Sequence, residues 1–232
     1  MTAVASLAER LAAVSSAVDD AVASAGRDSE DVTTIVVTKF HPASLVRELS
    51  ALGVRNFGES RHQEASLKTA ELADIEATWH FVGQVQSKKA RQVRRYADVI
   101  HSVDRESLVH AWTAPADGAD AERPIGVFLQ INLTDDPARG GVLPTGLEAL
   151  ADQVASVDGL HLLGVMAVAP LDEEPRRAFA RVRELSEKLR LSHPAAAALS
   201  MGMSGDFADA IAEGATHLRI GTAITGNRPN HG

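Results

Sequence analysis

The sequence predicts an α/β protein built as a single (β/α)8 barrel of the TIM type, with an extra helix ahead of the barrel. Eight short apolar runs alternate with longer segments of helical periodicity over roughly 200 residues, which is the pattern of a closed parallel barrel. Gly53, Gly159 and Gly214 each lie between a helical segment and the next apolar run, where a helix end favours a left-handed residue. A doubly wound open sheet is the alternative architecture.

The first segment predicts an amphipathic helix. Within residues 2 to 25, five apolar residues recur at spacings of three and four, as on one face of a helix. We expect this helix to pack on the outside of the barrel, as an N-terminal addition within residues 1 to 30. The apolar residues are Leu7, Leu11, Val14, Val18 and Val22.

The apolar runs that follow are the expected strands of the barrel. Between the first two runs, Leu45, Leu49 and Leu52 show the period of a crossover helix. The stretch 114–124, rich in Ala, Asp, Gly and Pro, predicts an exposed loop too short to separate domains, so we expect one domain over residues 1 to 232. The expected strands are TIVVTK (34–39), VRNFG (54–58), WHFVG (79–83), VIHSV (99–103), VFLQINL (127–133), LLGVMAV (162–168), AALSMG (197–202) and HLRIG (217–221).

Composition and charge exclude several classes of protein. With 31 acidic and 23 basic residues, the net charge of -8 disfavours binding to nucleic acid or to anionic membranes. The absence of cysteine excludes disulfides, thiolate metal sites and cysteine nucleophiles, and it fits a reducing compartment. Neither a membrane-spanning apolar run nor an export signal is found. We therefore expect a cytoplasmic protein with no membrane or nucleic-acid partner.

The histidines and the basic run predict no separate site. The nine histidines form no HExxH or HxH pair, so we expect no metal, and we expect His80 and His101 to be satisfied pocket or core residues. The basic run at residues 88–95 has no interleaved aromatic residues for stacking on bases. We expect it to form a solvated helix face.

The first expected strand ends in a lysine. Ligand-binding groups of a parallel barrel gather at the C-terminal ends of the strands, because the βα loops open there. Lys39 follows three β-branched residues and Thr38 at such an end. Its position alone leaves two interpretations open, a solvated lysine leaving the sheet or an amine that forms a Schiff base with an aldehyde.

The last two strands predict a phosphate site. Arg219 precedes Gly221, Thr222 and a short helix, where close backbone approach, helix N–H groups and a hydroxyl can hold a phosphate. The preceding strand delivers Ser200 and Ser204. Because the last strand closes against the first, the amine, the guanidinium and these donors describe a pocket for a phosphorylated aldehyde.

Taken together, these motifs resemble the pyridoxal 5'-phosphate homeostasis protein family, whose members are related to the barrel domain of alanine racemase. The resemblance covers residues 5 to 228 and implies an alanine racemase N-terminal domain-like barrel. The matching motifs, in the order of the family, are VVTKFHPAS, NFGES followed by QEA, WHFVGQVQSKKAR, IHSVDR, QINL, GVMAV, LSMGMSGD and RIGTAITG.

The resemblance implies that pyridoxal 5'-phosphate (PLP) is the cofactor and that Lys39 holds it as a Schiff base. By the same resemblance, Arg219 would lie beside the pyridine nitrogen, Met166 would form part of the pocket wall and Asn56 would lie near the ring.

The phosphate of the cofactor is implied to lie at the ends of the last two strands. Ser204, Gly221 and Thr222 would hold it, with Ser200 nearby. The resemblance therefore implies the same phosphate-binding role that the positions of these residues at the strand ends indicate.

The sequence departs from the common family pattern at several positions. Ser60 and Arg61 stand where Asn-Tyr is frequent, and His41 stands where a second lysine is frequent. Gln84 and Lys88 replace a common His and Asn. These changes leave the implied cofactor-binding residues intact, but they put in doubt a role for a second lysine in receiving or releasing the cofactor.

The implied site favours a carrier over an enzyme. An arginine beside the pyridine nitrogen disfavours ring protonation and weakens the cofactor as an electron sink. Racemisation also needs an acid-base group on each face of the substrate carbon, and the related racemases supply one as a tyrosine from a separate β domain. The one tyrosine here, Tyr96, is predicted on a largely polar helix. We expect a monomeric protein of PLP homeostasis without turnover, with apo PLP-dependent enzymes as partners; the alternative is a PLP-dependent, racemase-like enzyme.

Overall fold

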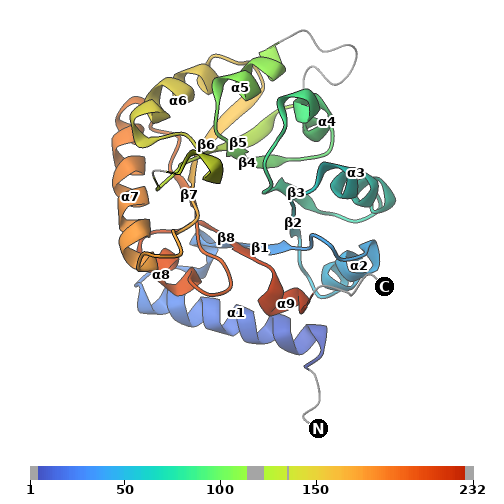
Figure 1. Cartoon of the computed structure of the whole chain (residues 1–232). Helices are drawn as coiled ribbons and strands as arrows, with labels where there is room; N and C mark the ends of the chain where they lie inside the picture. Colours follow the sequence, from blue (N-terminus) through green and yellow to red (C-terminus); the bar gives the residue numbers. More distant parts are fainter. Residues whose placement is uncertain (1–4, 114–122, 135, 228–232) are drawn as a thin grey trace.

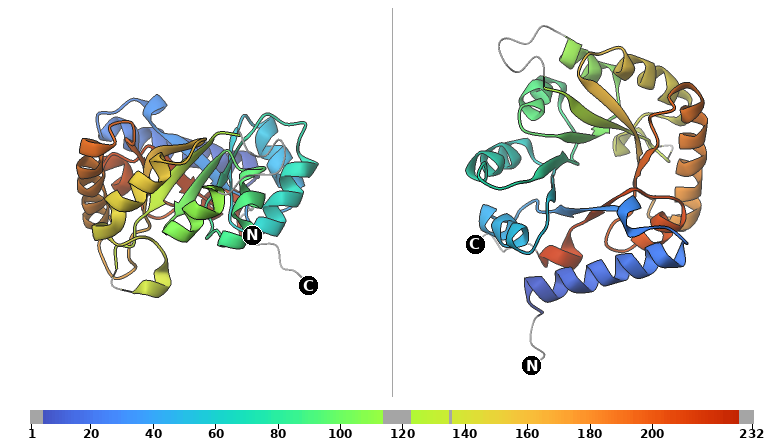
Figure 2. Two further views of the ribbon diagram at one scale, coloured as in Figure 1. Left: turned by 90° about the horizontal axis from the view of Figure 1, so that it is seen from above. Right: turned by 180° about the vertical axis from the view of Figure 1, so that it is seen from behind.

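The computed structural model of the protein describes residues 5–113, 123–134 and 136–227. Eight parallel strands close into a barrel in chain order, and helices surround the strands on the outside (Figure 1 and Figure 2). The predicted (β/α)8 barrel is confirmed, and the open sheet is excluded because the last strand pairs with the first. Most of the loop predicted at residues 114–124 lies outside the described residues.

The elements follow the predicted alternation of strand and helix. The strands are β1 (Thr33–Val37), β2 (Asn56–Glu59), β3 (Thr78–Phe81), β4 (Val99–Val103), β5 (Ile125–Gln130), β6 (Leu160–Met166), β7 (Ala198–Ser200) and β8 (His217–Ile220). The α-helices are α1 (Leu7–Ser24), α2 (Ala43–Ala51), α3 (His62–Glu71), α4 (Ala90–Arg94), α5 (Glu106–Thr113), α6 (Leu147–Ala155), α7 (Pro175–Ser192), α8 (Phe207–Ala212) and α9 (Thr222–Thr225). Short 3-10 helices lie at Ser29–Asp31, Ser87–Lys89, Pro137–Arg139 and Pro144–Gly146.

Strand side chains alternate between the barrel interior and the apolar layer under the helices. On β1, Val36 belongs to the outer layer, so Ile35, Val37 and then Lys39 lie on the inner face. The same alternation on the other strands directs polar and aromatic residues into the barrel. These inward residues are Asn56, Gly58, His80, His101, Phe128, Met166, Ser200, His217 and Arg219.

The predicted N-terminal helix is confirmed as α1. It lies along α8 and α9 on the outside of the barrel (Figure 1). Val18 and Val22 are buried, whereas Leu7, Leu11 and Val14 are partly buried against the same core. The apolar stripe in the sequence therefore marks the face that packs.

Turn chemistry agrees with the sequence, while the end of the first strand differs. Gly53, Gly159 and Gly214 have φ values of +95°, +76° and +92°, which confirms the left-handed turns expected there. β1 ends at Val37, so Lys39 lies in the loop after the strand and does not end it as predicted.

Of the other predicted strands, β4 has the predicted bounds, 99–103, and the rest differ from the observed ones at their ends. β5 and β6 each begin two residues earlier than expected, because Ile125 already pairs with Leu160. β5 also ends earlier, since Ile131 makes only an isolated bridge to Val142. Apolar runs alone do not mark where backbone pairing starts and stops.

Candidate functional site

The predicted site residues lie at the C-terminal mouth of the barrel and in its interior. Lys39 follows β1 in the same alternating register as the inward residues Ile35 and Val37, and it is partly buried. Its amine makes no hydrogen bond or ion pair with any residue in the described ranges. The structure therefore presents an unpartnered amine at the mouth.

Arg219 lies deeper, on the neighbouring strand. Its partner in the β1–β8 register is Ile35, four residues before Lys39. The guanidinium donates from Nη1 to the Ser200 Oγ at 2.6 Å and from Nη2 to the carbonyl oxygen of Ala167 at 2.9 Å. Burial lowers the pKa of Arg219 to about 10, which leaves it charged at neutral pH.

A hydrogen-bonded chain crosses the barrel interior from Arg219. His101 Nδ1 lies 2.8 Å from the Ser200 Oγ, and its Nε2 lies 3.0 Å from Nδ1 of His80. His80 Nε2 lies 3.0 Å from the Oδ1 of Asn56. Because the guanidinium only donates and the amide oxygen only accepts, this network assigns the ring hydrogen of both histidines to Nε2.

The interior histidines are held neutral. Burial lowers the pKa of His80 to about 3, and burial together with the charge of Arg219 lowers the pKa of His217 to about 4. Burial, helped by His80 and Arg219, also holds the pKa of His101 well below its ordinary value. Phe128 stacks on His101 at a centroid distance of 4.6 Å. The prediction that His80 and His101 are satisfied interior residues is confirmed.

The loops after β7 and β8 carry the predicted phosphate donors. Ser204 is partly buried and Thr222 is exposed. In α9 the first intrahelical hydrogen bond runs from Ile224 N to Gly221 O, so the two preceding helical N–H groups lie ahead of the ladder. Arg10 donates from Nε to the Ile224 carbonyl oxygen at 2.7 Å, which ties this short helix to α1.

The structure brings some of the predicted residues together directly. Ser200 and Arg219 are hydrogen-bonded, Met166 pairs with Ser200 in the β6–β7 register, and Asn56 is linked to both through the two histidines. Lys39 has no hydrogen bond to the other predicted residues that the structure describes. The set therefore consists of a connected interior group with an amine at the mouth.

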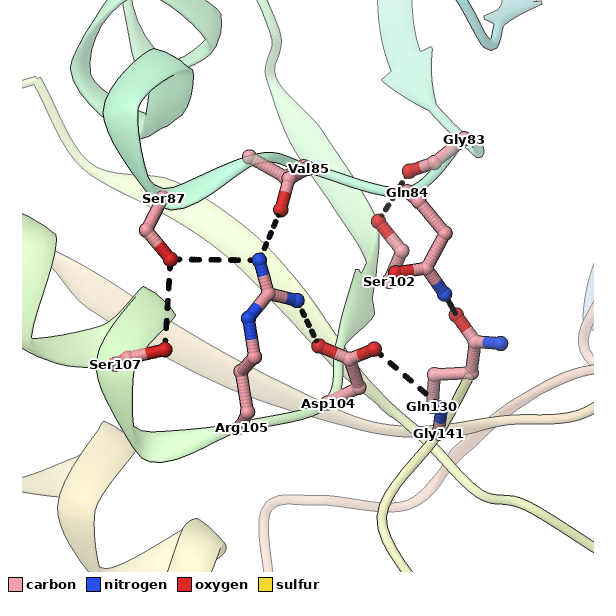
Figure 3. Close-up of polar contacts among 10 residues, drawn as sticks. All are labelled: Gly83, Gln84, Val85, Ser87, Ser102, Asp104, Arg105, Ser107, Gln130 and Gly141. Atoms are coloured by element: carbon pink, nitrogen blue, oxygen red, sulfur yellow. Dashed lines mark hydrogen bonds and ion pairs between the residues drawn. The ribbon is translucent and has the colours of Figure 1, made fainter. Parts of the chain in front are cut away.

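A separate polar network frames the rim after β3, β4 and β5 (Figure 3). Arg105 donates to the Asp104 carboxylate at 2.5 Å and to the carbonyl oxygen of Val85 at 2.6 Å. The other Asp104 oxygen accepts the Gly141 N–H at 3.4 Å. These contacts join three loops of the rim, and none of the predicted site residues takes part.

A cavity of about 910 Å³ lies between α3 and the loops after β1, β2 and β3. Four of the positions that depart from the family pattern line it, namely His41, Ser60, Arg61 and Gln84, together with Phe40. The departures therefore gather beside the mouth and away from the interior group.

Two expectations about the segment around α4 need correction. The basic run was expected to be solvated, but Arg94 is 7% exposed and donates from Nη2 to the carbonyl oxygen of Arg123 at 3.1 Å. The reason is that α4 packs one face on the barrel, and Arg94 lies on that face. Tyr96 follows α4 in a turn and stacks on His62 at a centroid distance of 5.9 Å.

Two classes of feature are absent from the described part of the chain. No group of three or more His, Cys, Asp or Glu side chains there could hold a metal ion. No helix in those same ranges is long and apolar enough to cross a membrane.

Sequence reasoning missed two polar groups. The hydrogen-bonded pair of His80 and His101 was expected only as separate satisfied residues. A buried ion pair between Glu59 and Lys68, 2.6 Å apart, was not expected at all. Its signal was present, because alternation in NFGE places the carboxylate under the helices, where it needs a partner.

The fold and its strand-end residues define a barrel of the alanine racemase N-terminal domain class, since the family with that description matches residues 11–229. A pyridoxal phosphate homeostasis protein of Pseudomonas aeruginosa is 42% identical over 230 residues, which cover 96% of each chain. One of Escherichia coli K12 is 36% identical over 229 residues, covering 96% of this chain and 97% of that protein. The chain belongs to the pyridoxal phosphate homeostasis protein family.

Solved structures agree with this assignment. PipY of Synechococcus elongatus PCC7942, solved with PLP bound, is 36% identical with a TM-score of 0.80, covering 95% of this chain and all of that one. Alanine racemase of Corynebacterium glutamicum is 17% identical with a TM-score of 0.71, and the match covers 96% of this chain and 63% of the racemase. This second likeness is one of fold.

Proposed function

We propose that the protein binds PLP as a Schiff base on Lys39 and holds it for release to other proteins in the cytoplasm. The observation that carries the proposal is an unpartnered, inward-facing amine at the barrel mouth, above the buried guanidinium of Arg219 on the next strand. A relative with 36% identity was solved with PLP bound, which supports the choice of cofactor.

The residues present fit the chemistry of this cofactor. Arg219 uses two of its five N–H groups on described residues, so a further donor is available to an unprotonated ring nitrogen. Ser204 and Thr222 offer hydroxyls, and the start of α9 offers N–H groups to a phosphate. Met166, 3% exposed, supplies an apolar wall.

The covalent step needs only the lysine and the aldehyde. The neutral Lys39 amine attacks the aldehyde carbon, a C=N bond forms and one water molecule leaves. When bound, PLP can withdraw electrons from an amine attached to it. Arg219 donates a hydrogen bond and cannot accept one, so it holds the ring nitrogen unprotonated and limits that withdrawal.

We infer that the protein is a carrier and not an enzyme, and that it acts as a monomer on one barrel domain with α1 attached. The curated relatives reported above are named homeostasis proteins, which supports this role. Tyr96, the one tyrosine of the sequence, packs on His62 and Phe81, outside the interior group. The alternative, a racemase-like enzyme, rests on the likeness of fold.

We expect the PLP-loaded protein to exchange the Cα proton of amino acids far more slowly than an enzyme does. Deuterium incorporation into alanine and other amino acids in heavy water measures this rate, and recovery of activity by an apo PLP-dependent enzyme measures cofactor transfer. Transfer without exchange supports the carrier. Exchange at about 1 per second or faster, an ordinary turnover rate, would establish the racemase-like alternative.

We expect the loss of either hydroxyl donor to weaken PLP binding selectively. Ser204→Ala or Thr222→Val should each reduce PLP affinity by about 10- to 150-fold, the cost of a hydrogen bond to a charged group. Affinity for pyridoxal, which lacks the phosphate, should change little in titrations of the same variants. Ser156→Ala, at the exposed end of α6, is the control. Equal losses for both ligands would show that neither hydroxyl touches the phosphate.

A further inference from the structure

A buried charged cluster lies on the outer side of the barrel wall, behind the segment that carries Lys39. We propose that this cluster positions the Lys39 amine for its reaction with the aldehyde, an inference that rests on the proposed function. The cluster, which we call the Lys68 cluster, consists of Thr38, Glu59, Glu64 and Lys68.

The cluster and the lysine lie on opposite faces of the wall. Thr38 continues the outward alternation of Val36, and its hydroxyl donates to the Glu59 Oε1 at 2.6 Å. Glu59 is 1% exposed and lies under α3, the helix that supplies Lys68. Thr38 and Glu59 therefore act on the backbone beside Lys39 from the outer face of the wall, whereas Glu64 also lines the cavity beside the mouth.

Lys68 is fully engaged by oxygen atoms. Its Nζ lies 2.6 Å from the Glu59 Oε1, 3.1 Å from the Glu64 Oε1 and 3.1 Å from the Thr38 carbonyl oxygen. A protonated amine has three donors, and these three acceptors use all of them. Since it is also 4% exposed, the Lys68 amine is not accessible to an aldehyde.

The cluster holds both neighbours of Lys39. Thr38 is bound through its hydroxyl and its carbonyl oxygen, and the Phe40 N–H donates to the Glu64 Oε1 at 2.6 Å. Phe40 has φ +68°, the one positive value at a non-glycine position in the described ranges. A bulky residue rarely adopts this conformation, so the charged acceptor stabilises a turn that the backbone alone disfavours.

The side chain of Lys39 itself makes no hydrogen bond or ion pair with any described residue, while its main chain is fixed on both sides. This is the arrangement that a reactive amine needs, because a fixed backbone limits where the amine can lie and no hydrogen-bond partner holds it away from the aldehyde. We therefore assign Glu64 and Lys68 as positioning residues.

Glu64 offers the sharpest test of this assignment. Its side chain is 23% exposed, and its removal leaves the buried pair of Glu59 and Lys68 intact, so the fold should survive. Glu64→Ala removes the acceptor of the Phe40 N–H, whereas Glu64→Gln retains an oxygen that can accept it. Asp74→Ala is the matched control, because it removes an exposed carboxylate in the turn after α3 that is bound to Arg47 of α2.

Two measurements test whether the Lys68 cluster holds the segment around Lys39 in place. In the cofactor-free protein, amide hydrogen exchange in a peptide covering residues 36–44 should become about 10-fold faster or more in Glu64→Ala, the effect of losing a hydrogen bond to a charged group. PLP affinity should fall by a similar factor, while affinity for pyridoxine 5'-phosphate, which has no aldehyde, stays the same. Glu64→Gln should recover much of both effects, and Asp74→Ala should show neither.

Unchanged exchange in Glu64→Ala would overturn the proposal, and so would equal losses of affinity for the two ligands. Failure of the proposed function is distinguishable, because the parent protein would then bind PLP without an absorbance band near about 420 nm. Amide exchange in the cofactor-free protein tests the positioning role of the Lys68 cluster whether or not Lys39 forms the Schiff base.

Discussion

Replacing Lys39 with alanine is expected to abolish the covalent bond between the protein and PLP. The parent protein should show an absorbance band near about 420 nm, typical of a protonated Schiff base, that borohydride reduction removes. The variant should lack this band, because Lys68 is buried and fully hydrogen-bonded. Residual binding through the phosphate and ring contacts would leave only the spectrum of free aldehyde.

The fold of the Lys39→Ala variant should be unaffected. Lys39 makes no hydrogen bond or ion pair with any described residue, so the free energy of unfolding should change by less than about 0.5 kcal/mol. Lys89→Ala, at the partly buried lysine beside the cavity, is the matched control and should keep the band. A normal, reducible band in Lys39→Ala would mean that another lysine carries the cofactor.

A second large effect is expected in acid, where the protein should lose stability because its folded state keeps the interior histidines neutral. The folded protein holds the pKa of His80 at about 3, that of His217 at about 4 and that of His101 well below the ordinary value. In the unfolded chain each would titrate near about 6.5. Between pH 7 and pH 5 only the unfolded state takes up these protons, so stability falls as the pH falls. The loss is about 2 kcal/mol for each histidine, or about 6 kcal/mol for the three.

Urea unfolding of the cofactor-free protein at pH 7 and pH 5 measures this loss. His80→Gln, whose amide can both accept from His101 and donate to Asn56, should reduce the loss by about 2 kcal/mol. Burial also raises the pKa of Glu59, so this residue adds to the stability of the folded state as the pH falls, opposite to the histidines. The contribution of His80 is therefore obtained by comparing the parent protein with the variant. His110→Gln, at an exposed position of α5, is the control. The same pH dependence in the parent and in His80→Gln would contradict the account.

The fold could be predicted from the sequence because the short apolar runs of the strands differ clearly from the 3.6-residue periodicity of the helices. Apolar runs and helical stripes predict the barrel, and residues such as Val18 and Val22 mark the packed face of α1. The ends of the strands were predicted less accurately than their order, because the apolar run that contains Lys39 extends beyond the paired residues of β1. Pairing depends on neighbouring strands, which local sequence does not describe.

The interior of the site was harder to predict than its mouth. Arg219 and Ser200 could be expected together because their strands are adjacent in the ring. The link through His101 and His80 to Asn56 joins residues far apart in sequence, and it depends on the register of strands across the barrel. The burial of Arg94 depends in the same way on the orientation of a short helix.

The central claim is that Lys39 holds the cofactor, and trapping the bond followed by peptide mapping tests it most directly. The protein loaded with PLP is reduced with borohydride and digested, and the modified lysine is identified by mass spectrometry. The sequence contains five lysines, Lys39, Lys68, Lys88, Lys89 and Lys188. We predict a pyridoxyl phosphate group on Lys39 alone, in proportion to the cofactor bound. The same group on a different lysine, or bound cofactor that leaves no modified lysine, would contradict it.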